Sequence, residues 1–153
     1  MTKKLSLLVT TTLLFVSMVQ GTAALAAGPA DRGLPVATTA KHRLVIQVSE
    51  ADPKRWNLAL NNARNIQQDL GRDNVEIEIV AYGPGIGMLK ADSEVASRLI
   101  EASSDGVKLA ACENTMKAQK LSPADMHIAT GFVPSGVVEL MLKQEQGYAY
   151  LRP

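Results

Sequence analysis

Residues 107–120, VKLAACENTMKAQK, pass from a short apolar run into a polar segment. The apolar run, 107–111, is typical of a short buried strand. The polar segment from Asn114 to about Lys120 is predicted to be a helix. Cys112 stands at the junction, at the carboxyl end of the predicted strand. This stretch therefore indicates an α/β fold in which a thiol lies between a strand and a helix.

The same alternation extends along the chain in both directions. Further strands are predicted at 43–48, 75–81 and 148–151, with an irregular one within 126–133. Further helices are predicted at 53–70, from Asp92 or Ser93 to about 103, and at 136–146. Alternating strands and helices favour an open, mainly parallel sheet with helices on both faces. In such sheets, ligands bind at the carboxyl ends of the strands.

Local signals predict where two helices begin or end. Asp52 followed by Pro53 is typical of a helix start, with the carboxylate as N-cap and proline in the first helical position. Gly71 suits the position just after the last turn of that helix. Ser135 is interpreted as the N-cap of the last helix rather than as a nucleophile, because no nucleophile-elbow motif surrounds it.

The predicted strand 75–81 differs from the others because Glu76 and Glu78 alternate with apolar residues. This alternation indicates one polar face. We therefore expect the strand at a rim or an interface of the sheet rather than at its centre. The two carboxylates are expected to face solvent or another subunit and not to form a catalytic pair.

Composition excludes several classes of protein. With 153 residues, 46% of them hydrophobic, the chain suits one globular domain and is too apolar to be disordered. The net charge of +1 gives no reason to expect a nucleic-acid partner. A single cysteine excludes an internal disulfide. His42 and His127 are far apart, with no ligand at metal-site spacing, so no metal or cofactor is expected.

The first residues have the parts of a secretory signal peptide. Lys3 and Lys4 precede a mostly apolar stretch, 5–19, and Ala24-Leu25-Ala26 has the small residues that signal peptidase requires. Residues 1–26 are therefore predicted to be removed, with Ala24 and Ala27 as other possible ends. The apolar stretch is interrupted by Ser and Thr and is shorter than the roughly 20 residues of a membrane span. We expect an exported, periplasmic protein with no membrane anchor after cleavage.

Residues 27–41 are rich in Ala, Gly, Pro and Thr and show neither helical nor strand periodicity. They are predicted to be a flexible leader, or an arm that crosses a neighbouring subunit. The domain itself is predicted to occupy residues 42–153.

Cys112 allows two interpretations. A thiol just before a helix lies near free N–H groups and the positive end of the helix dipole, which favour the reactive thiolate, although Glu113 opposes ionisation. Alternatively, Cys112 is a small buried apolar residue. The glycine-rich loop 83–87 also allows two interpretations. Its N–H groups could hold an anion. Alternatively, the loop is only a tight turn, because its glycine spacing matches neither a dinucleotide-binding loop nor a phosphate-binding loop.

Three segments resemble the DsrE/DsrF-like family, and in particular its small stand-alone members. They are AYGPGIGML (81–89), AACENTMKAQKL (110–121) and FVPSGVVELMLKQEQGYAYLRP (132–153), and the resemblance extends over roughly 42–153. It implies a three-layer α/β/α sandwich with a five-stranded, mainly parallel sheet. It also implies a homo-oligomer, often a trimer or a hexamer.

In family members that act in sulfur relay, a cysteine at the matching place carries sulfur as a persulfide, and the resemblance gives this role to Cys112. Tyr82 stands where many relatives have a histidine. We therefore expect an exported sulfur carrier, served by donor and acceptor proteins, whose pocket is formed by Tyr82, Gly83, Gly85, Asn114 and Thr115. Whether it acts as a sulfurtransferase stays open. The alternatives are a non-catalytic binding or assembly module with a structural cysteine, and redox sensing through an intermolecular disulfide.

Overall fold

The computed structural model describes residues 41–153. The predicted signal peptide, and all of the predicted leader except Lys41, lie outside the described residues. The strands are β1 (His42–Val48), β2 (Val75–Ala81), β3 (Lys108–Cys112), β4 (Gly131–Val133) and β5 (Ala149–Leu151). The α-helices are α1 (Pro53–Leu70), α2 (Ala96–Ser104), α3 (Glu113–Ala118) and α4 (Gly136–Glu145). Short 3-10 helices are η1 (Arg72–Asn74), η2 (Gly83–Leu89) and η3 (Pro123–Asp125).

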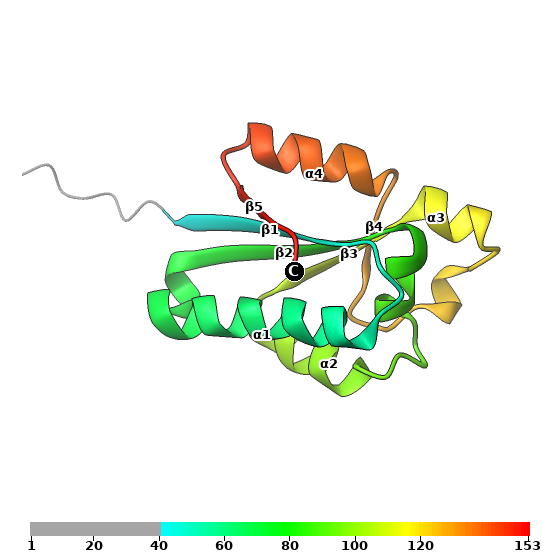
Figure 1. The fold of residues 1–153 in the computed structure, drawn as a ribbon, viewed down its shortest axis with the longest axis horizontal. Helices are drawn as coiled ribbons and strands as arrows, with labels where there is room; N and C mark the ends of the chain where they lie inside the picture. Colours follow the sequence, from blue (N-terminus) through cyan, green and yellow to red (C-terminus); the bar gives the residue numbers. More distant parts are fainter. Residues whose placement is uncertain (1–40) are drawn as a thin grey trace, which may run out of the picture. The chain divides into compact units, whose positions relative to one another are not determined.

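The strands form one sheet in the order β4-β3-β2-β1-β5, and every neighbouring pair is parallel. Helices α1 and α2 cover one face of this sheet and α4 covers the other (Figure 1). The predicted α/β fold and its three layers are therefore confirmed. All strands end at the same edge, so the residues that follow them are brought together there. Within residues 41–153, no helix has both the length and the apolar character that crossing a membrane requires.

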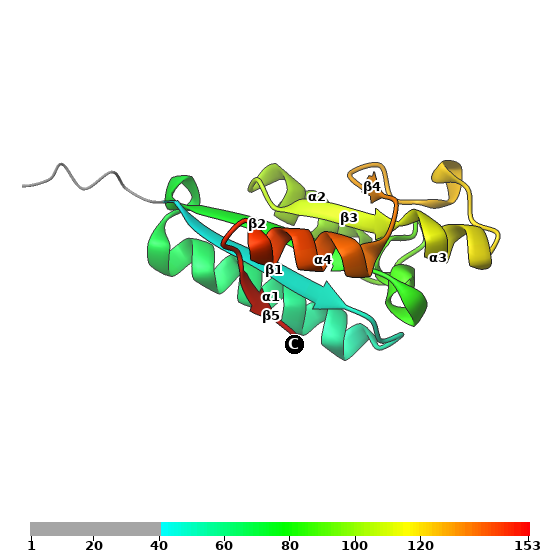
Figure 2. The ribbon, with the colours of Figure 1, turned by 90° about the horizontal axis from the view of Figure 1, so that it is seen from above.

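Two apolar clusters hold the layers together. The larger one lies between the sheet and helices α1 and α2, and includes the fully buried Ile46, Ile79 and Leu99. The smaller one lies beneath α4, where Leu140 packs against Val45 of β1 and against neighbouring strands. Seen from above, α4 lies over the middle of the sheet, and β4 lies beyond it at one edge (Figure 2).

The local signals are mostly confirmed. The Asp52 carboxylate accepts a hydrogen bond from the Lys54 N–H at 2.9 Å, and α1 ends at Gly71, which has a φ of 86°. Ser135 occupies the N-cap position of α4, but its side chain makes no capping hydrogen bond. Helix α2 begins only at Ala96, later than predicted, because Ser93 instead forms a turn in which its hydroxyl accepts from the Val95 N–H.

The expected position of strand 75–81 is wrong, because β2 is the central strand of the sheet. Glu78 is only 4% exposed, and its carboxylate forms an ion pair of 2.6 Å with Lys143 of α4. Glu76 forms an ion pair of 2.6 Å with Lys108 of β3. The polar face exists, but α4 covers it and supplies the cation. The alternation of polar and apolar residues along a strand indicates that one face is polar, but it does not indicate which element will pack on that face.

Candidate functional site at the end of β3

Cys112 is the last residue of β3 and directly precedes α3. It is 5% exposed. Its side chain lies against the start of α4, because a Cβ atom at Gly136 would be 3.3 Å from the Cys112 Cβ and 2.9 Å from the Tyr82 Cβ. The absence of a side chain at position 136 thus allows α4 to begin in contact with the ends of β2 and β3. The thiol sits where two helices start.

Hydrogen bonds outweigh burial in setting the charge of this thiol. Burial raises the pKa of Cys112, but the Thr115 hydroxyl and the backbone N–H groups of Gly136, Thr115 and Asn114 lower it, and the net pKa is below its usual value. The Asn114 N–H also donates a hydrogen bond of 3.2 Å to the Pro134 carbonyl, so it stabilises the thiolate less than the other donors do. The site favours a thiolate, which is the nucleophilic form.

The glycine loop contacts this site through Thr115. The Gly83 N–H donates a hydrogen bond of 2.9 Å to the Thr115 hydroxyl oxygen. The Gly83 carbonyl accepts one of 3.1 Å from the Gln119 side chain. Loop and helix α3 are therefore joined on both sides of Gly83, and the Thr115 proton is left to point at the sulfur.

The structure places the predicted pocket residues differently. Gly83, Thr115 and Tyr82 meet around Cys112, whereas the Asn114 side chain is exposed to solvent. Gly85 is buried against the end of β1, where a Cβ would collide with the Val48 carbonyl. Its N–H already donates to the carbonyls of Ser49 and Tyr82. Gly85 therefore shapes the loop and has no N–H to offer to a ligand.

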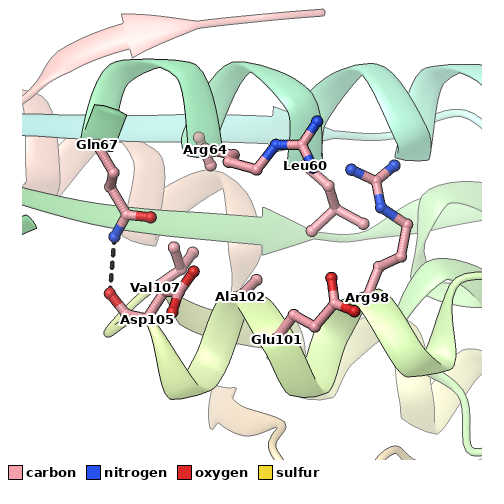
Figure 3. A pocket seen from close by; sticks show the side chains of 9 residues that line it. Leu60, Arg64, Gln67, Arg98, Glu101, Ala102, Asp105 and Val107 are labelled. Carbon is pink, nitrogen blue, oxygen red and sulfur yellow. Dashed lines mark hydrogen bonds between the residues drawn. The ribbon is translucent and has the colours of Figure 1, made fainter. Parts of the chain in front are cut away.

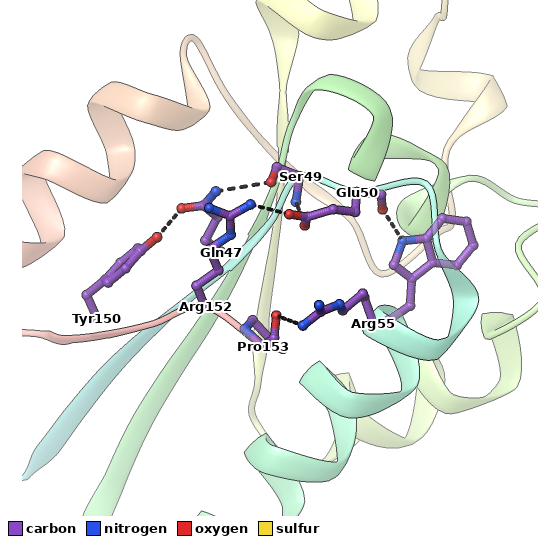
Figure 4. Close-up of polar contacts among 8 residues, drawn as sticks. Gln47, Ser49, Glu50, Arg55, Tyr150, Arg152 and Pro153 are labelled. Carbon is purple, nitrogen blue, oxygen red and sulfur yellow. Dashed lines mark hydrogen bonds and ion pairs between the residues drawn. The ribbon is translucent and has the colours of Figure 1, made fainter.

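Tyr82 lies between the thiol and a second polar group. Its Cβ and ring edge lie against Gly136, and its half-buried ring raises the pKa of the phenol, chiefly through burial. Beyond it, the Tyr150 hydroxyl donates to the side chain of Gln47, which donates in turn to the Ser49 hydroxyl at 3.1 Å (Figure 4). These contacts tie β5 to the end of β1.

An ion pair borders this polar group at the surface. Arg152, just after β5, contacts the carboxylate of Glu50, just after β1 (Figure 4). The Arg152 guanidinium, with a smaller contribution from Ser49, lowers the pKa of Glu50 to about 2. Both charges are thus present at any physiological pH and neutralise each other.

Sequence reasoning missed Gly136. Its N–H group reaches the sulfur and its missing side chain makes room for it. A signal existed in Pro134-Ser135-Gly136, since glycine is a poor helix former and is unusual in the first turn unless something lies close to the backbone. The contact itself joins residues far apart in the chain, so only the fold reveals it.

Other features of the described part do not form a site. Among residues 41–153, no three His, Cys, Asp or Glu side chains are grouped to hold a metal ion. His127 is buried, and its Nδ1 accepts a hydrogen bond of 3.2 Å from the Ala129 N–H. A cavity of about 30 Å³ lies between α1 and α2, where Gln67 donates to the Asp105 carbonyl at 2.7 Å (Figure 3). It has room for a water molecule and lies on the opposite face from Cys112.

Comparison with known proteins agrees with this architecture. The model of the DsrE/DsrF-like family matches residues 42–153. Among solved structures, the chain is similar to MTH1491, a protein of unknown function from Methanobacterium thermoautotrophicum, with 37% identity and a TM-score of 0.70 over 73% of this chain and 99% of that one. No match is found among curated proteins.

Two more distant structures share the fold. BT1422 from Bacteroides thetaiotaomicron, a conserved protein of unknown function, is 19% identical with a TM-score of 0.58, over 76% of this chain and 99% of that one. The ychN protein from E. coli is 12% identical with a TM-score of 0.57, over 73% of this chain and 99% of that one. The family match spans every element of the sheet and includes the cysteine at the end of β3. The chain belongs to the DsrE/DsrF-like family.

Proposed function

We propose that this protein is a sulfur carrier that holds a sulfane sulfur as a persulfide on Cys112. The observation that carries the proposal is the set of donors around the thiol: the Thr115 hydroxyl and the N–H groups of Thr115 and Gly136 lower the pKa of Cys112 despite its burial. Donors that stabilise a thiolate also stabilise a persulfide anion. Membership of a family generally related to sulfur relay supports the same reading.

The chemistry is thiol exchange in two steps. The Cys112 thiolate attacks the outer sulfur of a donor R–S–SH; a new S–S bond forms, the S–S bond of the donor breaks, and the donor leaves as R–S⁻. The proton stays on the transferred sulfur. An acceptor thiolate later attacks that outer sulfur, takes it with its proton, and releases Cys112 as the thiolate. No net oxidation occurs, and no other residue needs to change its bonds.

Intact-protein mass spectrometry tests the carrier directly. Protein is incubated with inorganic tetrasulfide and measured before and after reduction. A gain of one sulfur mass that reductant removes, and that the Cys112→Ser variant lacks, is expected. Failure of a folded protein to gain the adduct would overturn the proposal.

A second function is favoured by one observation, the 5% exposure of Cys112. A buried thiol suits a non-catalytic binding or assembly module in which the cysteine is structural. Reaction with a thiol reagent at neutral pH separates the two functions. Full protection until the protein is denatured favours the module, whereas reaction in the folded state favours the carrier.

We also infer that the protein assembles with copies of itself, as a trimer or a hexamer. Helix α4 carries apolar residues that are 40–56% exposed: Val137, Val138, Met141 and Leu142. Contiguous exposed apolar side chains of this kind are typical of interaction sites. Sedimentation or light scattering on the purified protein gives the number of subunits, and a monomer would contradict the inference.

Export is the last part of the proposal. The basic residues, apolar stretch and small residues within 1–26 support removal of this segment by signal peptidase. Mass measurement of protein from the periplasmic fraction should find a chain that begins at Ala27. A full-length chain confined to the cytoplasm would contradict the proposed export.

A further inference from the structure

Gln119 directly follows α3, and its side chain contacts the glycine loop. Its amide donates a hydrogen bond of 3.1 Å to the Gly83 carbonyl. Thr115 lies four residues earlier, and its carbonyl accepts a hydrogen bond of 2.9 Å from the Gln119 N–H, so the two side chains lie one helical turn apart on the same face. The Gly83 N–H donates to the Thr115 hydroxyl oxygen at 2.9 Å. One glycine is thus held at its N–H and at its carbonyl by side chains of a single turn.

The backbone of Gly83 needs this restraint. Its φ is 53°, in the left-handed region, which glycine adopts readily but to which it is not confined. The space around its Cα atom is open, since a Cβ atom there would lie 4.0 Å from its nearest neighbour, the Ser49 carbonyl oxygen. Close packing therefore does not fix the direction of the Gly83 N–H, and the hydrogen bonds to Thr115 and Gln119 do so instead.

The direction of the Gly83 N–H matters because the Thr115 hydroxyl also faces the thiol. Among the groups that lower the pKa of Cys112, this hydroxyl contributes the most. A hydroxyl has one proton and can give it to one acceptor at a time. While the Gly83 N–H occupies a lone pair of the oxygen, the proton is directed to the sulfur. Without that N–H, the hydroxyl is free to rotate towards other acceptors.

We propose that Gln119 is a positioning residue for sulfur transfer at Cys112. Its amide holds the Gly83 carbonyl, the loop in turn keeps its N–H on the Thr115 oxygen, and the hydroxyl proton stays on the sulfur. The inference rests on the carrier function proposed above and adds a residue that keeps its thiolate ready to react. Gln119 acts through Gly83 and Thr115 and forms no bond to the transferred sulfur. Because its side chain is exposed, it can be replaced without loss of core packing.

The pH dependence of Cys112 alkylation tests this role in Gln119→Met, whose side chain has a similar length but no N–H. We expect the pKa of the thiol to rise and alkylation at neutral pH to slow about three-fold, since a hydrogen bond between neutral groups contributes less than one to a charged group. Gln68→Met is the control, at an exposed glutamine in the last turn of α1, and should keep the wild-type profile. A loss of stability alone would leave the pH profile unchanged. An unchanged profile in Gln119→Met, or an equal shift in both variants, would overturn the inference.

A double variant shows whether Gln119 acts through Thr115. In Thr115→Val there is no hydroxyl to orient, so the addition of Gln119→Met should change the alkylation rate by less than about 1.5-fold. A further three-fold slowing would mean that the two residues act independently, and would overturn the inference. The tetrasulfide experiment keeps the two proposals distinguishable. If wild-type Cys112 gains sulfur but Gln119→Met leaves the alkylation profile unchanged, only the positioning role fails. If the folded wild type reacts with neither tetrasulfide nor the alkylating reagent, the carrier function fails, and the positioning role fails with it.

Discussion

The N–H of Gly83 donates a hydrogen bond of 2.9 Å to the hydroxyl oxygen of Thr115. This bond occupies one lone pair of the oxygen and turns the hydroxyl proton away from Gly83. Cys112 then receives that proton as a hydrogen bond, and the bond lowers the pKa of the thiol. The glycine loop thus acts on the cysteine through a threonine rather than by touching the sulfur.

Removing the Thr115 hydroxyl should make the thiol less acidic. In Thr115→Val the pKa of Cys112 rises, since the largest of the contributions that lower it is lost. A hydrogen bond to a charged group contributes about 1.5–3 kcal/mol, so alkylation at neutral pH should slow by roughly ten-fold. The pH dependence of alkylation measures the shift. Thr115→Ser keeps the hydroxyl and should behave like the wild type; equal pKa values for Thr115→Val and Thr115→Ser would contradict the role.

Adding a single methyl group at the start of α4 should disturb the site. In Gly136→Ala the new Cβ would lie 2.9 Å from the Tyr82 Cβ, and neither atom can move without its backbone. Overpacking of this kind costs about 1–3 kcal/mol, which urea denaturation detects. Gln144→Ala, at an exposed position of the same helix outside the apolar surface, is the control and should change stability by less than about 0.5 kcal/mol. Similar stabilities for the two variants would show that α4 does not press on the site.

Charge on the outer face of α4 should prevent assembly. In the double variant Val138→Lys, Met141→Lys, two side chains that are 45% and 51% exposed become cationic without loss of core packing. The inferred oligomer should dissociate, which light scattering measures. Ile100→Lys on α2 is the control, since Ile100 is 54% exposed on the opposite side of the sheet. Dissociation by the control alone would place the interface on the other face.

Much of the fold could be predicted from the sequence because its signals are local. Asp52, Pro53 and Gly71 mark the ends of α1 within a few residues of sequence, and the structure has the helix there. The short apolar run before Cys112 likewise predicts β3 to within one residue. Each of these elements carries its own capping residue or apolar pattern, so no distant contact is needed to find it.

The rest depended on contacts between distant residues. The sequence predicts that Glu78 faces solvent, because its partner Lys143 lies 65 residues later in the chain and only the fold brings the two together. The sequence predicts that Gly136 is an ordinary helix residue, and only the fold shows that Tyr82 and Cys112 pack against it. In each case the chemistry arises from register and layer order, which periodicity does not encode.

The buried ion pair beneath α4 should give stability a specific dependence on pH. Burial raises the pKa of Glu78, and Lys143 offsets this only in part. In Lys143→Met the carboxylate loses its partner, and leaving a charge buried alone costs about 3–5 kcal/mol. Because the folded pKa of Glu78 then lies further above its unfolded value, the variant is relatively more stable at low pH and loses stability as pH rises through the folded pKa.

Urea denaturation of Lys143→Met at about pH 5 and about pH 8 measures this dependence, with the larger deficit relative to wild type expected at the higher pH. The double variant Glu78→Gln, Lys143→Met removes the charge that needs a partner. It should recover most of the lost stability at the higher pH and show little pH dependence of its own, because a neutral amide does not titrate. A deficit in Lys143→Met that is the same at both pH values, or that the second substitution does not relieve, would mean that Lys143 contributes mainly through the contact of its ammonium with the Tyr148 ring, 5.0 Å from the ring centroid, rather than through Glu78.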